Sequence, residues 1–254
     1  MESKTVILKL SAQYEGDWEK IYNDIKTGTL VDEKIKVASK DEIRGVTILD
    51  EDYPESLKHI NRPPFVIYTE GDKKLLKNID KKLAIIGSRD IMLSEQTPRV
   101  LENIISKLEK DTVIVSGLAR GVDTLAHELA LKYGLKTIAV LPSGIDNIYP
   151  YKNRDLAAKI VEAGGLLVSE YPASTDPEPK HFVARNRIIV GFSEKVLTPE
   201  VKSRSGTMTT VSIALSEGKD IYVVPVPAGT PELQNNRLIK EGAELAELTE
   251  DLYY

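Results

Sequence analysis

Cysteine is absent from this 254-residue chain, and so are the long apolar runs typical of membrane proteins. Without cysteine there are no disulfides, no thiolate nucleophile and none of the commonest structural zinc sites. The uncharged apolar runs are far shorter than the roughly 20 residues that span a bilayer, and no basic-plus-apolar leader opens the sequence. We therefore expect a soluble, cytoplasmic protein with no membrane association.

Signatures of catalysis and of cofactor binding are also missing. The chain has three histidines, and the sequence offers no Ser-His-Asp arrangement in a supportive context, no metal-ligand cluster and no closely spaced carboxylate pair. The Gly-x-x-x-x-Gly-Lys-Ser/Thr signature of nucleotide hydrolases does not occur. These absences argue against ATP hydrolysis, and the sequence predicts no cofactor and no metal.

Apolar periodicity predicts the fold class. Hydrophobic residues make up 41% of the chain, which is enough for one sizeable core and a small appendage. From residue 83 onward, short apolar runs alternate with segments of helical spacing; the runs cover 83–87, 113–116, 137–141, 166–169, 195–198 and 221–225. This alternation is typical of a doubly wound α/β fold with a mostly parallel sheet. Pro199 cannot donate a ladder hydrogen bond, so the strand before it should end or turn outward there.

The N-terminal part is less regular. Residues 17–25 are expected to form a short helix, and residues 63–68 an extended segment that adds a strand to the main sheet. We predict a small helical N-terminal cap over residues 1–42 and a main domain over residues 43–254. Within that domain, the proline-rich stretch 171–180 is expected to be a surface loop.

Three glycine-containing turns stand where predicted strands end or predicted helices begin. They are Gly87-Ser88-Arg89, Ser116-Gly117-Leu118-Ala119-Arg120-Gly121 and Arg204-Ser205-Gly206-Thr207. Such turns aim backbone N–H groups and a helix N-terminus at an anion, and arginine adds the charge that phosphate requires. The sequence therefore predicts a phosphate-binding rim at one edge of the sheet.

Basic residues are concentrated in one segment. The net charge of the chain is −5, but residues 180–204 carry six basic and two acidic residues, a local net charge of +4. The segment is either a solvated basic face or part of an anion-binding surface.

Six motifs occur in the order and spacing of one bacterial family. They are GSR at 87–89, SGLARGVD at 116–123, LPSGIDNIYP at 141–150, SEYP at 169–172, HFVARNRII at 181–189 and NRLI at 236–239. Over roughly residues 50–251 the chain resembles the bacterial DNA-processing protein A family, DprA, also called Smf.

The resemblance implies an extended Rossmann-like domain that binds single-stranded DNA without enzymatic turnover. It further implies a homodimer formed through the C-terminal part, protection of incoming single strands, and help in loading the RecA recombinase during natural transformation. The chain departs from the family pattern in two places. Residues 197–201 read Leu-Thr-Pro-Glu-Val where relatives commonly read Val-Val-Glu-Ala, and the sequence stops at Tyr254 without the winged-helix tail of some relatives.

Single strands are bound through phosphate contacts from arginine, lysine and backbone N–H groups, and through stacking of their bases. On this basis the predicted DNA-binding residues are Gly87, Ser88, Arg89, Ser116, Gly117, Arg120, Gly121, Lys180, His181, Phe182, Arg185, Asn186, Arg187, Lys202, Ser205, Gly206 and Thr207. Arg89 and Arg120 are interpreted as phosphate ligands, with a structural role as the alternative.

Other candidates keep two interpretations. In a helix expected to begin near Ala184, Arg185 and Arg187 point to different faces, so one should contact DNA and the other should be structural. Phe182 either stacks on a base or packs into the core. His181 and Asn186 either contact a phosphate or close a loop.

Two other functions remain compatible with the sequence. One is that of the Rossmann-like nucleoside-monophosphate N-glycosidases, whose signature resembles Pro-Gly-Gly-x-Gly-Thr-x-x-Glu at the start of a helix. Residues 206–210 of this chain read Gly-Thr-Met-Thr-Thr, so Thr210 stands in place of the catalytic glutamate. A nucleotide-binding sensor would hold one mononucleotide in the same pocket. Preference for long single strands over mononucleotides distinguishes DNA binding from both.

Overall fold

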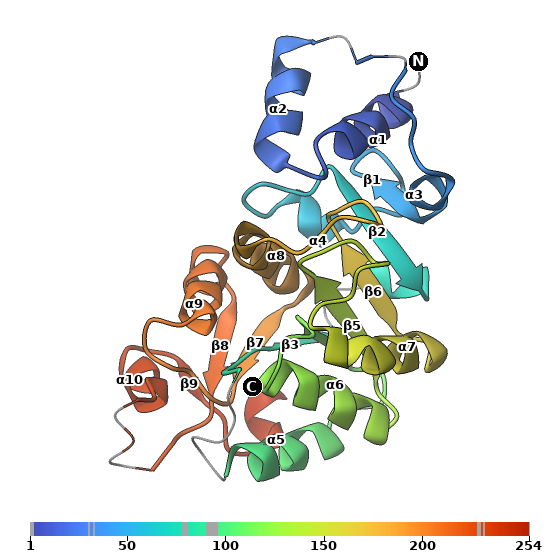
Figure 1. Cartoon of the computed structure of the whole chain (residues 1–254). Coiled ribbons are helices and arrows are strands. Elements are labelled where there is room, and N and C mark those ends of the chain that lie inside the picture. The colour runs from blue at the N-terminus through green and yellow to red at the C-terminus, as the bar shows by residue number, and fades with distance from the viewer. Residues whose placement is uncertain are drawn as a thin grey trace.

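A computed structural model describes residues 3–29, 31–32, 34–77, 81–89, 96–227, 230 and 232–253. Within this part of the chain a single sheet of nine strands runs in the order β1-β2-β6-β5-β4-β3-β7-β8-β9 (Figure 1). The strands are β1 (Gly45–Thr47), β2 (Val66–Gly71), β3 (Lys82–Ile85), β4 (Val113–Ser116), β5 (Lys136–Leu141), β6 (Leu166–Ser169), β7 (Lys195–Thr198), β8 (Asp220–Val223) and β9 (Glu244–Leu245).

The seven neighbouring strands β6-β5-β4-β3-β7-β8-β9 are parallel to one another. Strand β1 pairs antiparallel with β2, and β2 pairs antiparallel with β6. This arrangement confirms the predicted doubly wound α/β fold and the strand added by residues 63–68. The predicted end of a strand before Pro199 is also confirmed, because β7 stops at Thr198. Strand order reverses at β3, since β4 lies on one side of it and β7 on the other. Such a switch point opens a crevice at the carboxyl ends of the strands.

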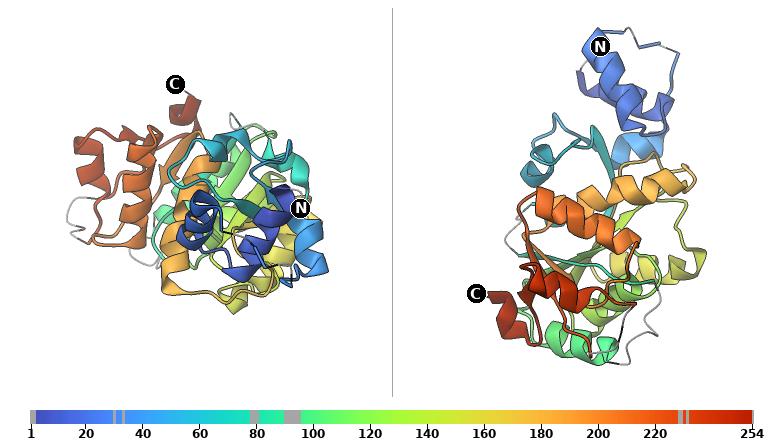
Figure 2. Two further views of the ribbon diagram at one scale, coloured as in Figure 1. Left: turned by 90° about the horizontal axis from the view of Figure 1, so that it is seen from above. Right: turned by 90° about the vertical axis from the view of Figure 1, so that its left-hand side faces the viewer.

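Helices cover both faces of the sheet (Figures 1 and 2). One apolar cluster joins it to α4 (Glu55–Lys58), α8 (Pro179–Phe192), α9 (Gly206–Ser216) and α10 (Asn235–Lys240). Two further clusters join the opposite face to α5 (Thr97–Ser106), α6 (Val122–Lys132) and α7 (Arg154–Glu162). Strand β4 shows the alternation directly: Val113 and Val115 enter the first cluster, and Ile114 between them enters the second. Burial on both faces explains why these strands are continuously apolar.

Three N-terminal helices precede the sheet: α1 (Ser3–Gln13), α2 (Trp18–Thr27) and α3 (Ser39–Arg44). Figure 1 shows α1 and α2 at one end of the molecule, beyond β1 and β2. The helix expected over 17–25 corresponds to α2, whose N-cap Asp17 accepts a hydrogen bond from the Lys20 amide. Ile7 and Leu8 of α1 pack in the same core cluster as Tyr68 of β2, so these helices share apolar core with the sheet.

Two expectations about the segment before α8 are wrong. The helix begins at Pro179 and not near Ala184, because Pro179 occupies the first turn, where its missing N–H is not needed. The stretch 171–180 is also not wholly a surface loop. Tyr171 and Ala173 are buried, and the Ala173 amide donates to Oδ1 of Asp41 in α3 at 2.8 Å.

A buried lysine makes the fold sensitive to pH. Lys82 is 3% exposed, and its ammonium donates to the carbonyl oxygens of Leu76 and Lys77. Burial lowers the pKa of Lys82 from 10.5 to about 8. The folded protein therefore binds fewer protons than the unfolded chain between these values, so stability rises with pH across that window.

We expect the free energy of unfolding of the wild type, relative to Lys82→Met, to rise by up to about 3 kcal/mol between pH 8 and 10.5. Below pH 8 the difference should be constant, because Lys82 is then charged in both states. Urea unfolding of both proteins across this range measures the effect. A difference that does not change with pH would contradict it.

Candidate functional site

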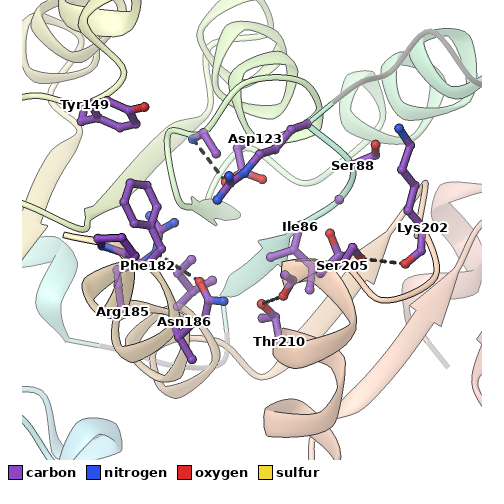
Figure 3. A pocket seen from close by; sticks show the side chains of 18 residues that line it. Ile86, Ser88, Asp123, Tyr149, Phe182, Arg185, Asn186, Lys202, Ser205 and Thr210 are labelled. Atoms are coloured by element: carbon purple, nitrogen blue, oxygen red, sulfur yellow. Dashed lines mark hydrogen bonds between the residues drawn. The ribbon is translucent and has the colours of Figure 1, made fainter. Parts of the chain in front are cut away.

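A cavity lies at the strand-order switch point. It has a volume of about 580 Å³ and opens where the turns after β3, β4 and β7 meet the N-terminal halves of α8 and α9 (Figure 3). The predicted residues that line it are Gly87, Ser88, Arg89, Phe182, Arg185, Asn186, Lys202, Ser205, Gly206 and Thr207. Ten of the 17 residues predicted from the sequence thus share one pocket.

Backbone hydrogen bonds hold the three turns together. The Ser88 amide donates to the Glu200 carbonyl at 2.9 Å, and the Val122 amide donates to the Ser88 carbonyl at 3.0 Å. The buried Ser116 hydroxyl donates to the Ile85 carbonyl at 2.6 Å. Ser116 and Gly121 are therefore parts of the scaffold that shapes the pocket, and neither lines it.

Gly121 has a backbone conformation that other residues rarely adopt, with φ 78° and ψ −125°. A Cβ there would also overlap the Ser88 carbonyl oxygen. We expect Gly121→Ala to lower the free energy of unfolding by at least about 2 kcal/mol. Gly206→Ala is the matched control, because its Cβ would meet nothing within 4 Å and its φ is not positive. Urea unfolding measures both variants, and equal losses would contradict this account.

Arg185 is buried beneath the pocket and is held by the scaffold. Its Nη1 donates to the carbonyl oxygens of Gly117 and Val140. Burial lowers the pKa of Arg185 to about 10, so the guanidinium stays charged at neutral pH. Gly117 is required because a Cβ at this position would overlap the guanidinium. Arg185 thus lines the pocket, but its charge is already used in internal contacts.

Asp123 in the first turn of α6 is the buried acidic residue beside Arg185. Its Oδ2 accepts hydrogen bonds from the amides of Gly117 at 3.1 Å and Ala119 at 3.3 Å. Burial raises the pKa of Asp123, and the positive charge of Arg185 acts in the opposite direction. Asp123 therefore fixes the turn that leads into α6.

Aromatic and cationic side chains meet at the mouth of the pocket. Phe182 is half-buried, and the Arg89 guanidinium lies 5.4 Å from its ring centroid. Tyr149 contacts the same ring edge-on, with the centroids 5.5 Å apart. Arg89 and Tyr149 are both exposed. Phe182 therefore keeps accessible surface at the pocket and is not a core residue.

The start of α9 faces the other side of the pocket. Its N-cap Ser205 accepts a hydrogen bond from the Met208 amide and donates one to the Lys202 carbonyl. Thr210, one turn into the helix, donates its hydroxyl to the Gly206 carbonyl at 3.1 Å. A helix N-terminus beside lysine and arginine side chains favours anions.

Four other residues that were predicted to bind DNA do not line the pocket: Arg120, Lys180, His181 and Arg187. Exposed Arg120 has no hydrogen bond or ion pair within the described part of the chain. Lys180 lies 3.1 Å from Glu178, with which it forms an ion pair. His181 is buried, stacks on Tyr171 at 4.0 Å and accepts from the Glu178 amide. Burial lowers the pKa of His181.

Arg187 is the fourth. Its Nη2 lies 2.6 Å from Glu170 Oε1, and both residues are buried. Burial alone would lower the pKa of Arg187, but the pKa is raised overall, with the Glu170 carboxylate as the main opposing cause. Further hydrogen bonds run to the carbonyls of Arg62 and Ala184. Arg185 borders the pocket and Arg187 does not, but both side chains bond within the protein, so the expectation that one of them contacts DNA stays a prediction.

Sequence reasoning missed Tyr149, which lies within the LPSGIDNIYP motif and lines the pocket. His127 of α6 is fully buried, and burial lowers its pKa to about 3. Among the described residues no group of three or more His, Cys, Asp or Glu could hold a metal ion. No helix in this part of the chain is long and apolar enough to cross a membrane.

Comparison with known proteins identifies relatives of this chain. The DNA recombination-mediator protein A family model matches residues 44–254. DNA processing protein DprA of Streptococcus pneumoniae is 40% identical over 208 residues, which cover 81% of this chain and 72% of that protein.

Two solved structures are similar as well. The X-ray structure of the Streptococcus pneumoniae protein matches with a TM-score of 0.76 and 35% identity, covering 92% of this chain and 79% of that one. DNA processing protein A of Helicobacter pylori, studied for its single-stranded DNA binding mode, matches with a TM-score of 0.71 and 32% identity over 82% of this chain and 93% of that one. With the family model covering most of its length and the DprA fold around its pocket, the chain belongs to the DNA recombination-mediator protein A family.

Proposed function

We propose that the pocket at the switch point binds single-stranded DNA, and that the protein protects incoming single strands and helps to load the RecA recombinase on them. The observation that carries the proposal is the cluster formed by exposed Arg89 and Tyr149 around the half-buried ring of Phe182, beside a cavity of about 580 Å³. Aromatic rings beside cations are the pattern on which the bases of single strands stack.

Phosphate groups have a matching surface on both sides of this cluster. Arg89 and Lys202 border the cavity, and the N-terminus of α9 begins beside Lys202 at Ser205. Guanidinium, ammonium and backbone N–H groups together neutralise phosphates and carry no sequence information. The strand would thus run across the turns after β3 and β7, with its backbone on the cations and one base turned toward the cavity.

No catalytic turnover is part of the proposal. Thr210 stands where the N-glycosidase signature has its catalytic glutamate. Its hydroxyl already donates a hydrogen bond to the Gly206 carbonyl. A carboxylate able to assist glycosidic cleavage is therefore missing at that position. The relatives named above support a recombination role, and the Helicobacter pylori protein supports single-stranded DNA as the ligand.

Self-association through the C-terminal part is the further element of the proposal. Leu245 and Leu248 are 43% and 47% exposed, respectively, and could be covered by a second copy of this chain. Leu238, in contrast, is 7% exposed and packs in the main core, so it is not available for such an interface.

Fluorescence anisotropy with labelled oligonucleotides tests the proposal. We expect tight binding to single strands, weak binding to duplexes, and affinity that falls steeply with salt because phosphate contacts release counterions. Mononucleotides should not compete. Binding of mononucleotides without binding of DNA would overturn the proposal in favour of a nucleotide sensor or a glycosidase, and product analysis would separate those two.

A further inference from the structure

Asn186 of α8 is a buried polar residue whose role the sequence leaves open. It is 9% exposed, follows Arg185 directly and lines the cavity. Figure 3 shows its amide at the floor of the pocket, between Arg185 and Thr210. A buried amide in such a place either completes its hydrogen bonds within the protein or offers them to a ligand.

Arg185 decides which way this amide faces. Nε of Arg185 lies 3.3 Å from Oδ1 of Asn186 and donates to it. A guanidinium carries donors and no acceptor, so the oxygen of the amide must face Arg185 and the nitrogen must face away. Arg185 itself cannot turn, because its Nη1 is bonded to the carbonyl oxygens of Gly117 and Val140.

Nδ2 of Asn186 consequently presents N–H donors to the cavity. Within the described residues it has no hydrogen-bond partner. The neighbouring walls at Ile86 and Ile189 are apolar, and Oδ2 of Asp123 is occupied by two backbone amides. Nδ2 is not one of the fully buried unpaired polar atoms of the described residues, so it is open to the cavity, where a ligand with an acceptor can bond to it.

Nucleobases differ in the acceptors that they can offer to such a donor. Thymine, guanine and cytosine carry keto oxygens, whereas adenine has ring nitrogens, of which N1 and N7 lie beside its own N6 amino donors. Asparagine usually pairs with adenine through both amide atoms. Here the oxygen is committed to Arg185, so the adenine pairing is blocked.

We propose that Asn186 reads a keto oxygen of the base that enters the pocket, so that thymine is preferred over adenine at that one position of the strand. The proposal rests on the proposed single-stranded DNA binding and adds specificity to it. Phosphate contacts by Arg89 and Lys202 remain indifferent to sequence.

The sharpest test is Asn186→Asp, measured as the ratio of the affinities for oligothymidylate and oligodeoxyadenylate. Aspartate has the shape of asparagine and still accepts from Arg185, but it replaces the inward donor with an acceptor oxygen. Added negative charge weakens all DNA binding and cancels in the ratio. We expect the wild-type preference for thymine to fall by about two- to tenfold, the effect of one hydrogen bond, and to shift toward adenine.

Self-stacking of adenine could also produce a wild-type preference, so a second probe is needed. Difluorotoluene has the shape of thymine without strong acceptors, and the wild type should bind thymidine strands more tightly than difluorotoluene strands. Asn186→Leu, which has no donor, should bind both equally. The control Asn23→Leu, on the exposed side of α2, should keep the wild-type ratios.

The outcomes separate the two proposals. If the wild type binds no single-stranded DNA, the proposed function falls and the inference falls with it. If the wild type binds tightly but Asn186→Asp and Asn186→Leu both keep its base ratios, only the inference about Asn186 is overturned.

Discussion

Replacing Phe182 with alanine is expected to weaken the binding of single-stranded DNA by about five- to one-hundred-fold, the effect of losing one stacked base. The ring is half-buried at the mouth of the pocket and lies between Arg89 and Tyr149. Because stacking is insensitive to salt, the loss should be similar at every salt concentration. Anisotropy titrations over a salt series measure both the affinity and its slope.

Arg89→Ala provides the contrasting variant. Loss of a phosphate contact should reduce the slope of log affinity against log salt by about 0.7 for a single strand, whereas Phe182→Ala should leave this slope unchanged. Tyr22→Ala is the matched aromatic control, since Tyr22 is 40% exposed on α2 and stacks on Trp18. A folded Phe182→Ala protein with wild-type affinity would remove the aromatic cluster from the DNA site.

The second large effect concerns stability. Arg187→Met should lower the free energy of unfolding by about 3 to 5 kcal/mol, because it leaves the buried Glu170 carboxylate without its partner. The carbonyls of Arg62 and Ala184 lose a donor at the same time. In a chain of this size such a loss corresponds to a decrease in Tm of about 10 °C.

Two comparisons make this prediction specific. The double variant Glu170→Leu/Arg187→Met should recover most of the stability, since an apolar pair replaces the ion pair with no charge left unpaired. Arg237→Met breaks the exposed pair with Glu241 in α10 and should cost less than about 1 kcal/mol. Equal losses for Arg187→Met and Arg237→Met in urea unfolding would contradict the account of the buried pair.

Much of the sheet could be predicted because its chemistry is local. Fully buried parallel strands such as β4 are short apolar runs, and the glycine turns that follow them mark their ends. The first residues of α8 could not be predicted in this way. Pro177 and Pro179 suggest a loop, although Pro179 in fact occupies the first turn of the helix.

The parts of the pocket that could be predicted are those in which several lining residues belong to one short motif. The glycine turns after β3 and β7 indicated a phosphate-binding rim, and Phe182 was a candidate for stacking on a base. Contacts between distant residues carry no such pattern. Arg187 bonds to Arg62, 125 residues away, and His127 is buried against Thr137 of the neighbouring strand, so neither environment follows from the local sequence.

The position of Asn186 shows the same limit at the site itself. Its sequence neighbours explain why it lies on α8, but the direction of its amide depends on Arg185, whose own direction depends on carbonyl oxygens of β5 and of the turn after β4. Function at this residue is therefore a property of the folded arrangement.

The central claim is that a single strand of DNA lies over the pocket between α8 and α9. Photocrosslinking with an oligonucleotide that contains 5-iodouracil, followed by mass spectrometry of the crosslinked peptide, tests it most directly. We predict crosslinks to Phe182 or Tyr149, the aromatic residues that line the pocket. Crosslinks confined to aromatic residues of the N-terminal helices, such as Trp18 and Tyr22, would contradict the claim.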